Sequence, residues 1–80
     1  MNIEILFFGI TADFVGKSKL EIKIPKNSTV ADFKELIVTD YPNLKNINEF
    51  AIAVNEDYAE DSVKLNPNDV VAIIPPVSGG

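Results

Sequence analysis

The chain has 80 residues, a formal net charge of −5 and an apolar content of 46%, which is typical of one small folded domain. It contains 0 Cys and 0 His, and all 7 basic residues are lysines. This inventory excludes zinc fingers, His-based metal sites, iron–sulfur clusters, cysteine nucleophiles and Ser-His-Asp triads. The acidic charge disfavours nucleic acid and anionic membranes as partners, and no apolar segment is long enough to cross a bilayer.

The same inventory bears on the compartment and on catalysis. The lack of cysteine, and of a basic region ahead of the first apolar run, predicts a cytoplasmic protein without a signal peptide. Without His, Cys and Arg, the chain is poorly equipped to be an enzyme by itself.

The N-terminal half predicts two strands and a helix. Residues 3–8 form a short apolar run and residues 20–24 alternate apolar and charged side chains, so both are expected to be strands of one hairpin. Residues 9–18 are expected to be the connecting loop. Ser28 or Thr29 is the expected N-cap of the helix. The helix should bury one apolar stripe, made of Val30, Phe33, Leu36, Ile37 and Tyr41, and end before Pro42.

The C-terminal half predicts three more strands. After a polar loop at 43–49, the expected elements are a strand at 50–54, a turn at 55–57, a short strand at 63–65, a turn at 66–69 and a strand at 70–74. The last run is almost entirely β-branched and is expected to be a central strand that is buried on both faces. Pro75 and Pro76 should end the sheet because proline cannot donate to a strand ladder.

Two of these strands have apolar side chains on both faces. Along the first strand, Ile3, Ile5 and Phe7 alternate with Leu6 and Phe8. One helix can cover only one face of a sheet. The other face is covered by loops such as 9–18, or it is an exposed patch that docks a partner protein. The alternation gives four candidates for such a partner face, with Phe8 as the anchor: Leu6, Phe8, Ala72 and Ile74.

The terminal residues Gly79 and Gly80 have no Cβ, so their backbone can enter a narrow channel. They also leave the terminal carboxylate sterically open. ATP could convert this carboxylate to an acyl-adenylate, from which a nucleophile displaces AMP to give a thioester, an amide or a thiocarboxylate. Most glycine-rich termini are simply frayed ends. Here the glycines follow a strand and the stiff Pro75-Pro76 pair, which favours a carrier function.

Three segments resemble one known family. They are Asp-Val-Val-Ala-Ile-Ile-Pro-Pro-Val-Ser-Gly-Gly at 69–80, Leu-Phe-Phe-Gly at 6–9 with Gly16 after it, and Ala-Val-Asn at 53–55. Together they are similar to the small subunits of molybdopterin synthase, which are ubiquitin-like sulfur carriers. The resemblance implies an α+β fold of the β-grasp type, a mixed sheet of about five strands with one main helix, in agreement with the element order. Residues 1–76 would form this domain and 77–80 a flexible tail.

The resemblance also implies site residues and partners. Gly80 would carry the sulfur, Gly79 would allow close passage, and Pro75, Pro76, Val77 and Ser78 would line the exit path. A ubiquitin-activating-type adenylyltransferase would adenylate Gly80 with ATP and magnesium, and a sulfur donor protein would then form the thiocarboxylate. The tail would enter the large catalytic subunit, in a heterotetramer, and pass sulfur to cyclic pyranopterin monophosphate. The chain itself would bind no cofactor and no metal.

One departure from the family pattern and one charged cluster complete the analysis of the sequence. Many members of the family carry Arg-Glu in the loop after the first strand, where this chain has Ala12-Asp13, so an arginine contact there would be absent. An acidic cluster at 56–61 lacks the spacing of a calcium loop and is expected to be solvated, where it could steer a basic partner. Three alternatives stay open: sulfur transfer for thiamine or tRNA thiolation, protein conjugation, and a non-catalytic interaction module with a passive tail.

Overall fold

The computed structural model describes residues 1–76, so the expectations for Val77, Ser78, Gly79 and Gly80 lie outside the described residues. Five strands are present: β1 (Asn2–Phe7), β2 (Lys19–Lys23), β3 (Ala51–Val54), β4 (Asp57–Tyr58) and β5 (Val70–Ile74). The helix α1 (Ile10–Val15) lies between β1 and β2. The helix α2 (Val30–Asp40) and the short 3₁₀ turns η1 (Pro42–Leu44) and η2 (Ile47–Glu49) lie between β2 and β3. None of the helices described is long and apolar enough to cross a membrane.

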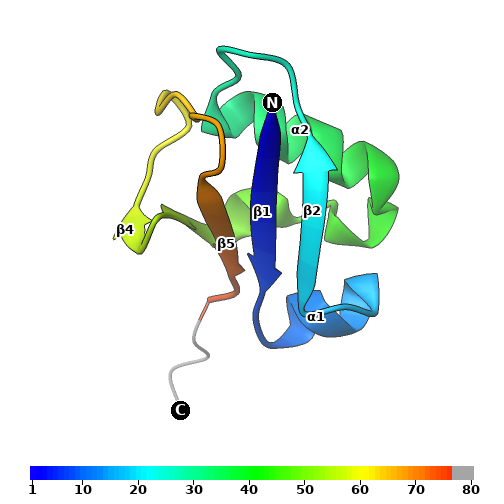
Figure 1. Cartoon of the computed structure of the whole chain (residues 1–80). Coiled ribbons are helices and arrows are strands. Elements are labelled where there is room, and N and C mark those ends of the chain that lie inside the picture. The colour runs from blue at the N-terminus through cyan, green and yellow to red at the C-terminus, as the bar shows by residue number, and fades with distance from the viewer. Residues whose placement is uncertain (77–80) are drawn as a thin grey trace.

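The strands form one mixed sheet in the order β2-β1-β5-β3-β4, and α2 lies behind it (Figure 1). β1 and β5 are parallel neighbours at the centre, whereas the other pairs are antiparallel. The expected α+β architecture with one main helix is confirmed. The expected pairing of the first two strands is also confirmed, with Ile5 opposite Leu20.

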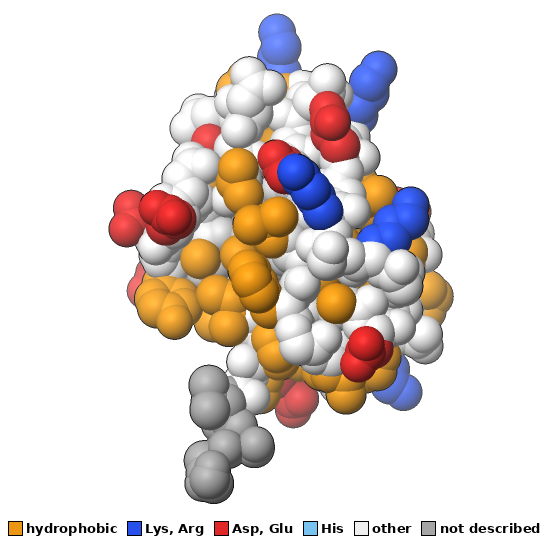
Figure 2. Space-filling model, turned by 60° about the horizontal axis from the view of Figure 1, so that its bottom comes forward, with side chains coloured by type: hydrophobic (Ala, Val, Ile, Leu, Met, Phe, Trp, Pro, Cys, Tyr) orange, Lys and Arg blue, Asp and Glu red, His pale blue; other side chains and the backbone are white. Residues whose placement is uncertain are grey.

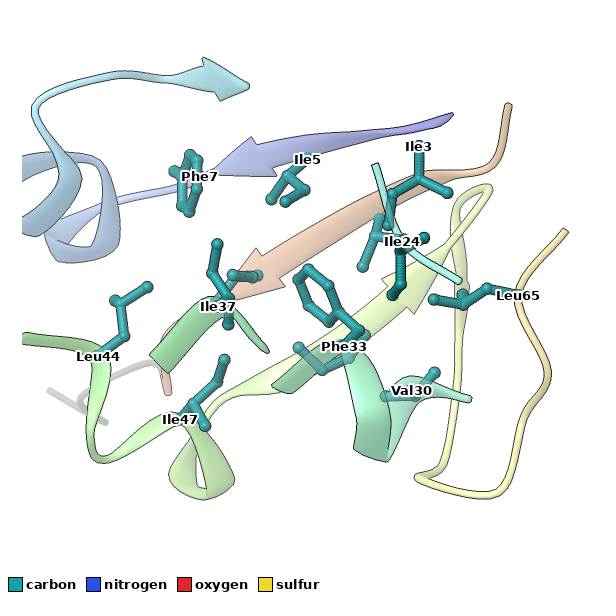
Figure 3. Packing of buried hydrophobic residues seen from close by; sticks show 13 residues of the cluster. Ile3, Ile5, Phe7, Ile24, Val30, Phe33, Ile37, Leu44, Ile47 and Leu65 are labelled. Carbon is teal, nitrogen blue, oxygen red and sulfur yellow. The ribbon is translucent and has the colours of Figure 1, made fainter. Parts of the chain in front are cut away.

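The core lies between α2 and one face of the sheet, which we call the inner face. Ile5 and Val71 are register partners on β1 and β5, and both are 0% exposed. Phe33 and Ile37 of α2 pack towards them (Figure 3). The stripe predicted on the helix therefore faces the core, although its members Leu36 and Tyr41 are only partly buried.

The start of α2 follows from local hydrogen bonds. Thr29 is the N-cap, and its Oγ1 accepts from the backbone N–H of Asp32 at 3.3 Å. The Asp32 carboxylate accepts in return from the Thr29 backbone N–H at 2.9 Å. This reciprocal capping box satisfies two N–H groups that a helix start leaves without intrahelical partners. Of the two N-cap candidates, Thr29 is thus the cap and Ser28 is buried just before it.

The expected position of the fourth strand is wrong. The fourth strand is Asp57–Tyr58 rather than 63–65, where only Lys64 makes an isolated bridge to Thr29. The reason is the turn at Asn55 and Glu56, whose φ angles of 51° and 75° are left-handed. That turn reverses the chain within two residues, so the next residues pair with β3 at once.

The connections also differ from the loops that the sequence predicts. Residues 10–15 of the expected 9–18 loop form α1, which ends at Gly16 with a left-handed φ of 78°. The expected loop at 43–49 contains η2 and the end of η1, and these turns bury Leu44 and Ile47 in the core. Two isolated apolar residues in a polar segment gave no periodic signal from which this burial could be predicted.

Candidate functional site

The outer face of the sheet carries a shallow groove of about 560 Å³, here called the outer groove. All four candidates for the partner face line it. The complete lining is Leu6, Phe8, Ala53, Asn55, Glu56, Tyr58, Val70, Ala72 and Ile74. The structure therefore brings the predicted residues together on one surface, while their binding role stays a prediction.

Strand register explains why these side chains meet. Leu6 pairs with Ala72, Ala72 with Ala53, and Ala53 with Tyr58, so one row crosses four strands. Partners in register point to the same side of a sheet. Small alanines in the middle of this row, between Leu6 and Tyr58, leave the hollow of the groove. The sequence analysis missed Ala53 and Tyr58, because the pairing of β3 with β5 cannot be deduced from alternation alone.

The groove is open, not covered by the preceding loop. Phe8 is 49% exposed and Tyr58 is 79% exposed. The helix α1 packs its Ala12 and Val15 against the core cluster at the end of the sheet, so it does not cover the outer face. The expectation that β5 is buried on both faces is consequently wrong for its outer residues, such as Ala72, which are half-buried.

A hydrogen-bond network fixes the rim of the groove. The Nδ2 of Asn55 donates to Oδ1 of Asp69 at 2.9 Å, and the backbone N–H of Val70 donates to Oδ1 of Asn55 at 3.0 Å. The other carboxylate oxygen of Asp69 accepts from the backbone N–H of Asn66 at 2.7 Å. Asp69 is only 7% exposed. The network ties the β3–β4 turn to the start of β5 and holds Glu56 at the rim.

Replacing Asn55 is expected to cost stability. The substitution Asn55→Ala removes the amide that donates to Oδ1 of Asp69 and accepts from the Val70 N–H, and alanine disfavours the left-handed φ at this position. We expect a loss of about 2 kcal/mol in the free energy of unfolding, measured by urea denaturation. Asn66→Ala is the control, because it keeps the backbone N–H that Asp69 uses. Equal losses in the two variants would contradict the role given to the Asn55 amide.

Charges lie on both sides of the apolar surface (Figure 2). The acidic cluster expected at 56–61 is divided: Glu56 stands at the rim, whereas Asp61 pairs with Lys34 of α2 at 2.6 Å. Among residues 1–76, no three acidic side chains are placed to hold a metal ion. On the edge strand β2, Lys19 pairs with Glu4 at 3.1 Å. The groove is thus apolar in its middle, with an acidic residue at the β3–β4 end.

The sheet ends where the sequence predicts. β5 stops at Ile74, and the described chain continues through the half-buried Pro75 to the exposed Pro76. Ile74 and Phe8 both line the outer groove, so the exit from β5 is next to the apolar surface. The groove and the strand that leads to the C-terminal segment are consequently parts of one region of the molecule.

Comparison with known protein families shows to which family the chain is related. The model of the ThiS family matches residues 5–80, which includes β2 to β5, the second half of β1, and Gly79 and Gly80. The chain belongs to the ThiS family. Curated relatives agree: the molybdopterin synthase sulfur carrier subunit of Dictyostelium discoideum is 36% identical over 99% of this chain and 96% of its own length. That of Caenorhabditis elegans is 34% identical over 100% of this chain and 99% of its own length.

Several solved structures have the same fold. A putative molybdopterin converting factor subunit 1 from Pyrococcus furiosus superposes with a TM-score of 0.88 at 26% identity, covering 96% of this chain and 99% of its own. Subunit 1 in a complex of molybdopterin-converting factor subunits 1 and 2 from Helicobacter pylori gives 0.72 at 27% identity, with 100% of both chains covered. Small archaeal modifier protein 1 from Haloferax volcanii gives 0.86 at 20% identity, over 95% and 98%. The ubiquitin-like β-grasp fold and the family resemblance are confirmed.

Proposed function

We propose that this chain is the sulfur carrier subunit of a molybdopterin synthase and that the carboxyl group of Gly80 carries the sulfur. One observation supports this proposal above the others. The family match extends to Gly80, and relatives that are 33% or more identical over the whole of this chain are named molybdopterin synthase sulfur carrier subunits. The proposal assigns the chemistry to the tail and the recognition to the sheet.

The chemistry needs only a carboxylate from this chain. The Gly80 carboxylate attacks the α-phosphorus of ATP on an adenylyltransferase of the ubiquitin-activating type, with magnesium held there, and pyrophosphate leaves. A hydrosulfide equivalent from a sulfur donor protein then displaces AMP and forms the thiocarboxylate. The chain contributes no His, Cys or Arg to these steps, so acid–base groups come from its partners.

The second half of the reaction takes place in the large catalytic subunit. The thiocarboxylate transfers its sulfur to cyclic pyranopterin monophosphate, and water restores the Gly80 carboxylate. The dithiolene of molybdopterin needs two sulfurs, so the carrier must dissociate, be loaded again and return. A small carrier that is released after each transfer requires an interface of moderate size.

The outer groove is the proposed docking surface for the large subunit. It is apolar at its centre, and Phe8 and Tyr58 present exposed aromatic rings that a partner can bury. It also lies beside the last residues of β5, so docking on the groove would bring the tail to the same partner. The solved complex of subunits 1 and 2 of molybdopterin-converting factor from Helicobacter pylori supports such a partner.

A reconstituted reaction tests whether cyclic pyranopterin monophosphate is the sulfur acceptor. The chain is incubated with ATP, magnesium, the activating enzyme, a sulfur donor, the large subunit and cyclic pyranopterin monophosphate, and molybdopterin is measured. We expect product only when every component is present. A chain that is loaded with sulfur but yields no molybdopterin would contradict this choice of sulfur acceptor and favour a role in thiamine synthesis or tRNA thiolation. A chain that docks and is never loaded would favour the passive interaction module.

A further inference from the structure

Gly9 is the N-cap of α1, directly before Ile10, and its backbone has φ 56° and ψ −132°. This conformation is close to the mirror image of the extended region, which side chains with a Cβ avoid. A Cβ built on Gly9 would lie 3.1 Å from Cγ of Pro75. An added Cβ on Gly9 would therefore require Pro75 or Gly9 to shift by a few tenths of an ångström.

The backbone around Gly9 is held on both sides. The Phe8 N–H donates to the carbonyl oxygen of Ile73 at 3.3 Å, which joins the ends of β1 and β5. The Phe8 carbonyl oxygen accepts from the hydroxyl of Thr11 at 2.6 Å, and Thr11 is 0% exposed. The Gly9 carbonyl oxygen accepts from the Ala12 N–H at 3.1 Å. Because these bonds hold Gly9 in place, the proline ring is the group that would have to yield to an added methyl.

A displaced Pro75 ring would redirect the chain that follows it. The proline ring fixes φ, and a residue before proline is restricted to extended conformations. Pro75 is subject to both restrictions, because Pro76 comes next. A shift of the Pro75 ring consequently changes the direction in which the chain continues through Pro76.

We propose that Gly9 is a positioning residue that sets the direction in which the chain leaves β5 towards Gly80, through its contact with Pro75. Its effect on sulfur transfer rests on the function proposed above, whereas its effect on Pro75 does not. Gly9 belongs to the strand–loop segment that precedes α1 and is 66 positions before Pro75, so no local pattern in the sequence links the two.

Gly9→Ala and Gly16→Ala form a matched pair of variants. Both glycines have a positive φ, 56° and 78°, but a Cβ on Gly16 would meet nothing within 4 Å. Both variants place a Cβ on a positive-φ backbone, with greater strain at Gly9 (ψ −132°) than at the left-handed Gly16 (ψ 14°), and only Gly9→Ala presses on Pro75. The double variant Gly9→Ala with Pro75→Ala removes the ring atom that the new methyl would meet.

Two readouts are measured on variants confirmed as folded by circular dichroism. The first is the set of backbone carbon chemical shifts of Ile74, Pro75 and Pro76 in the free chain. We expect them to move in Gly9→Ala and to stay at their wild-type values in Gly16→Ala. The second is steady-state sulfur transfer from the loaded carrier to the large subunit. We expect Gly9→Ala to lower kcat about tenfold and to change the KM for the carrier by less than about twofold.

The double variant completes the test. Adding Gly9→Ala to Pro75→Ala should lower kcat by less than adding it to the wild type, since the two positions act through one contact. Unmoved shifts at Pro75, equal kcat values for Gly9→Ala and Gly16→Ala, or fully additive losses would each overturn the proposal. Should the wild-type chain accept no sulfur while the shifts of Pro75 still move, the proposed function fails and the control of Pro75 by Gly9 stands.

Discussion

Deletion of Gly80 is expected to abolish sulfur transfer while leaving the fold and the docking affinity unchanged. In the proposed mechanism, the carboxylate of this residue is the only group of the chain that reacts. Deletion moves the carboxyl one residue back, about 3.5 Å along the chain, which is more than a catalytic site tolerates. We expect molybdopterin formation at or below the detection limit in the reconstituted assay.

The control for this deletion is a chain extended by one alanine after Gly80. It retains all 80 residues but displaces the reactive carboxyl in the opposite direction. Every member of the core cluster lies between Ile3 and Ile73, so both variants should unfold at the same urea concentration as the wild type. A truncated chain that still supports molybdopterin formation would contradict the assignment of Gly80.

Replacing Phe8 by aspartate is expected to produce the second-largest effect, a loss of affinity for the large subunit. Phe8 is 49% exposed in the free chain and lines the outer groove next to Ile74. The substitution removes an aromatic anchor from the docking surface. Docking would also bury the new carboxylate without a cation beside it, and an unpaired buried charge is unfavourable. We expect the Kd to rise about 30-fold or more, measured by calorimetric titration.

The matched control is Phe14→Asp. Phe14 is also an exposed aromatic residue, 37% accessible, but it belongs to α1 and does not line the groove. Its replacement should change the Kd by less than about threefold, as expected for a residue outside the docking surface. The free energy of unfolding should fall by about 1 kcal/mol or less in Phe8→Asp, because half of the ring is already in water. Equal Kd changes in both variants would remove Phe8 from the interface.

Local signals in the sequence are enough to predict most of the fold. The alternation of Ile3, Ile5 and Phe7 places these side chains inside, and the β-branched run at 70–74 becomes β5 with the expected bounds. The N-cap signal at Ser28 or Thr29 marks the start of α2 correctly to within one residue, and Thr29 is the cap. These elements are set by hydrogen bonds and burial within a few residues of each other, which a pattern can report.

The remaining features depend on contacts between distant segments. Nothing near Leu44 in the sequence indicates that it reaches the core, since it is buried by the packing of η1 against α1 and α2. Ala53 and Tyr58 line the outer groove because β3 pairs in register with β5 and with β4. The contact of Gly9 with Pro75 likewise follows from the parallel pairing of β1 with β5. Such pairings are features of the tertiary structure, so a single sequence does not reveal them.

The central claim, that Gly80 carries sulfur, is tested most directly by the intact mass of the chain. The chain is incubated with ATP, magnesium, an activating enzyme proven active on its own carrier, and a sulfur donor. The account predicts a mass gain equal to the replacement of one oxygen by sulfur, and no gain in the Gly80-deleted chain. An unchanged mass of the full chain would contradict the account, as would the same gain in the deleted chain.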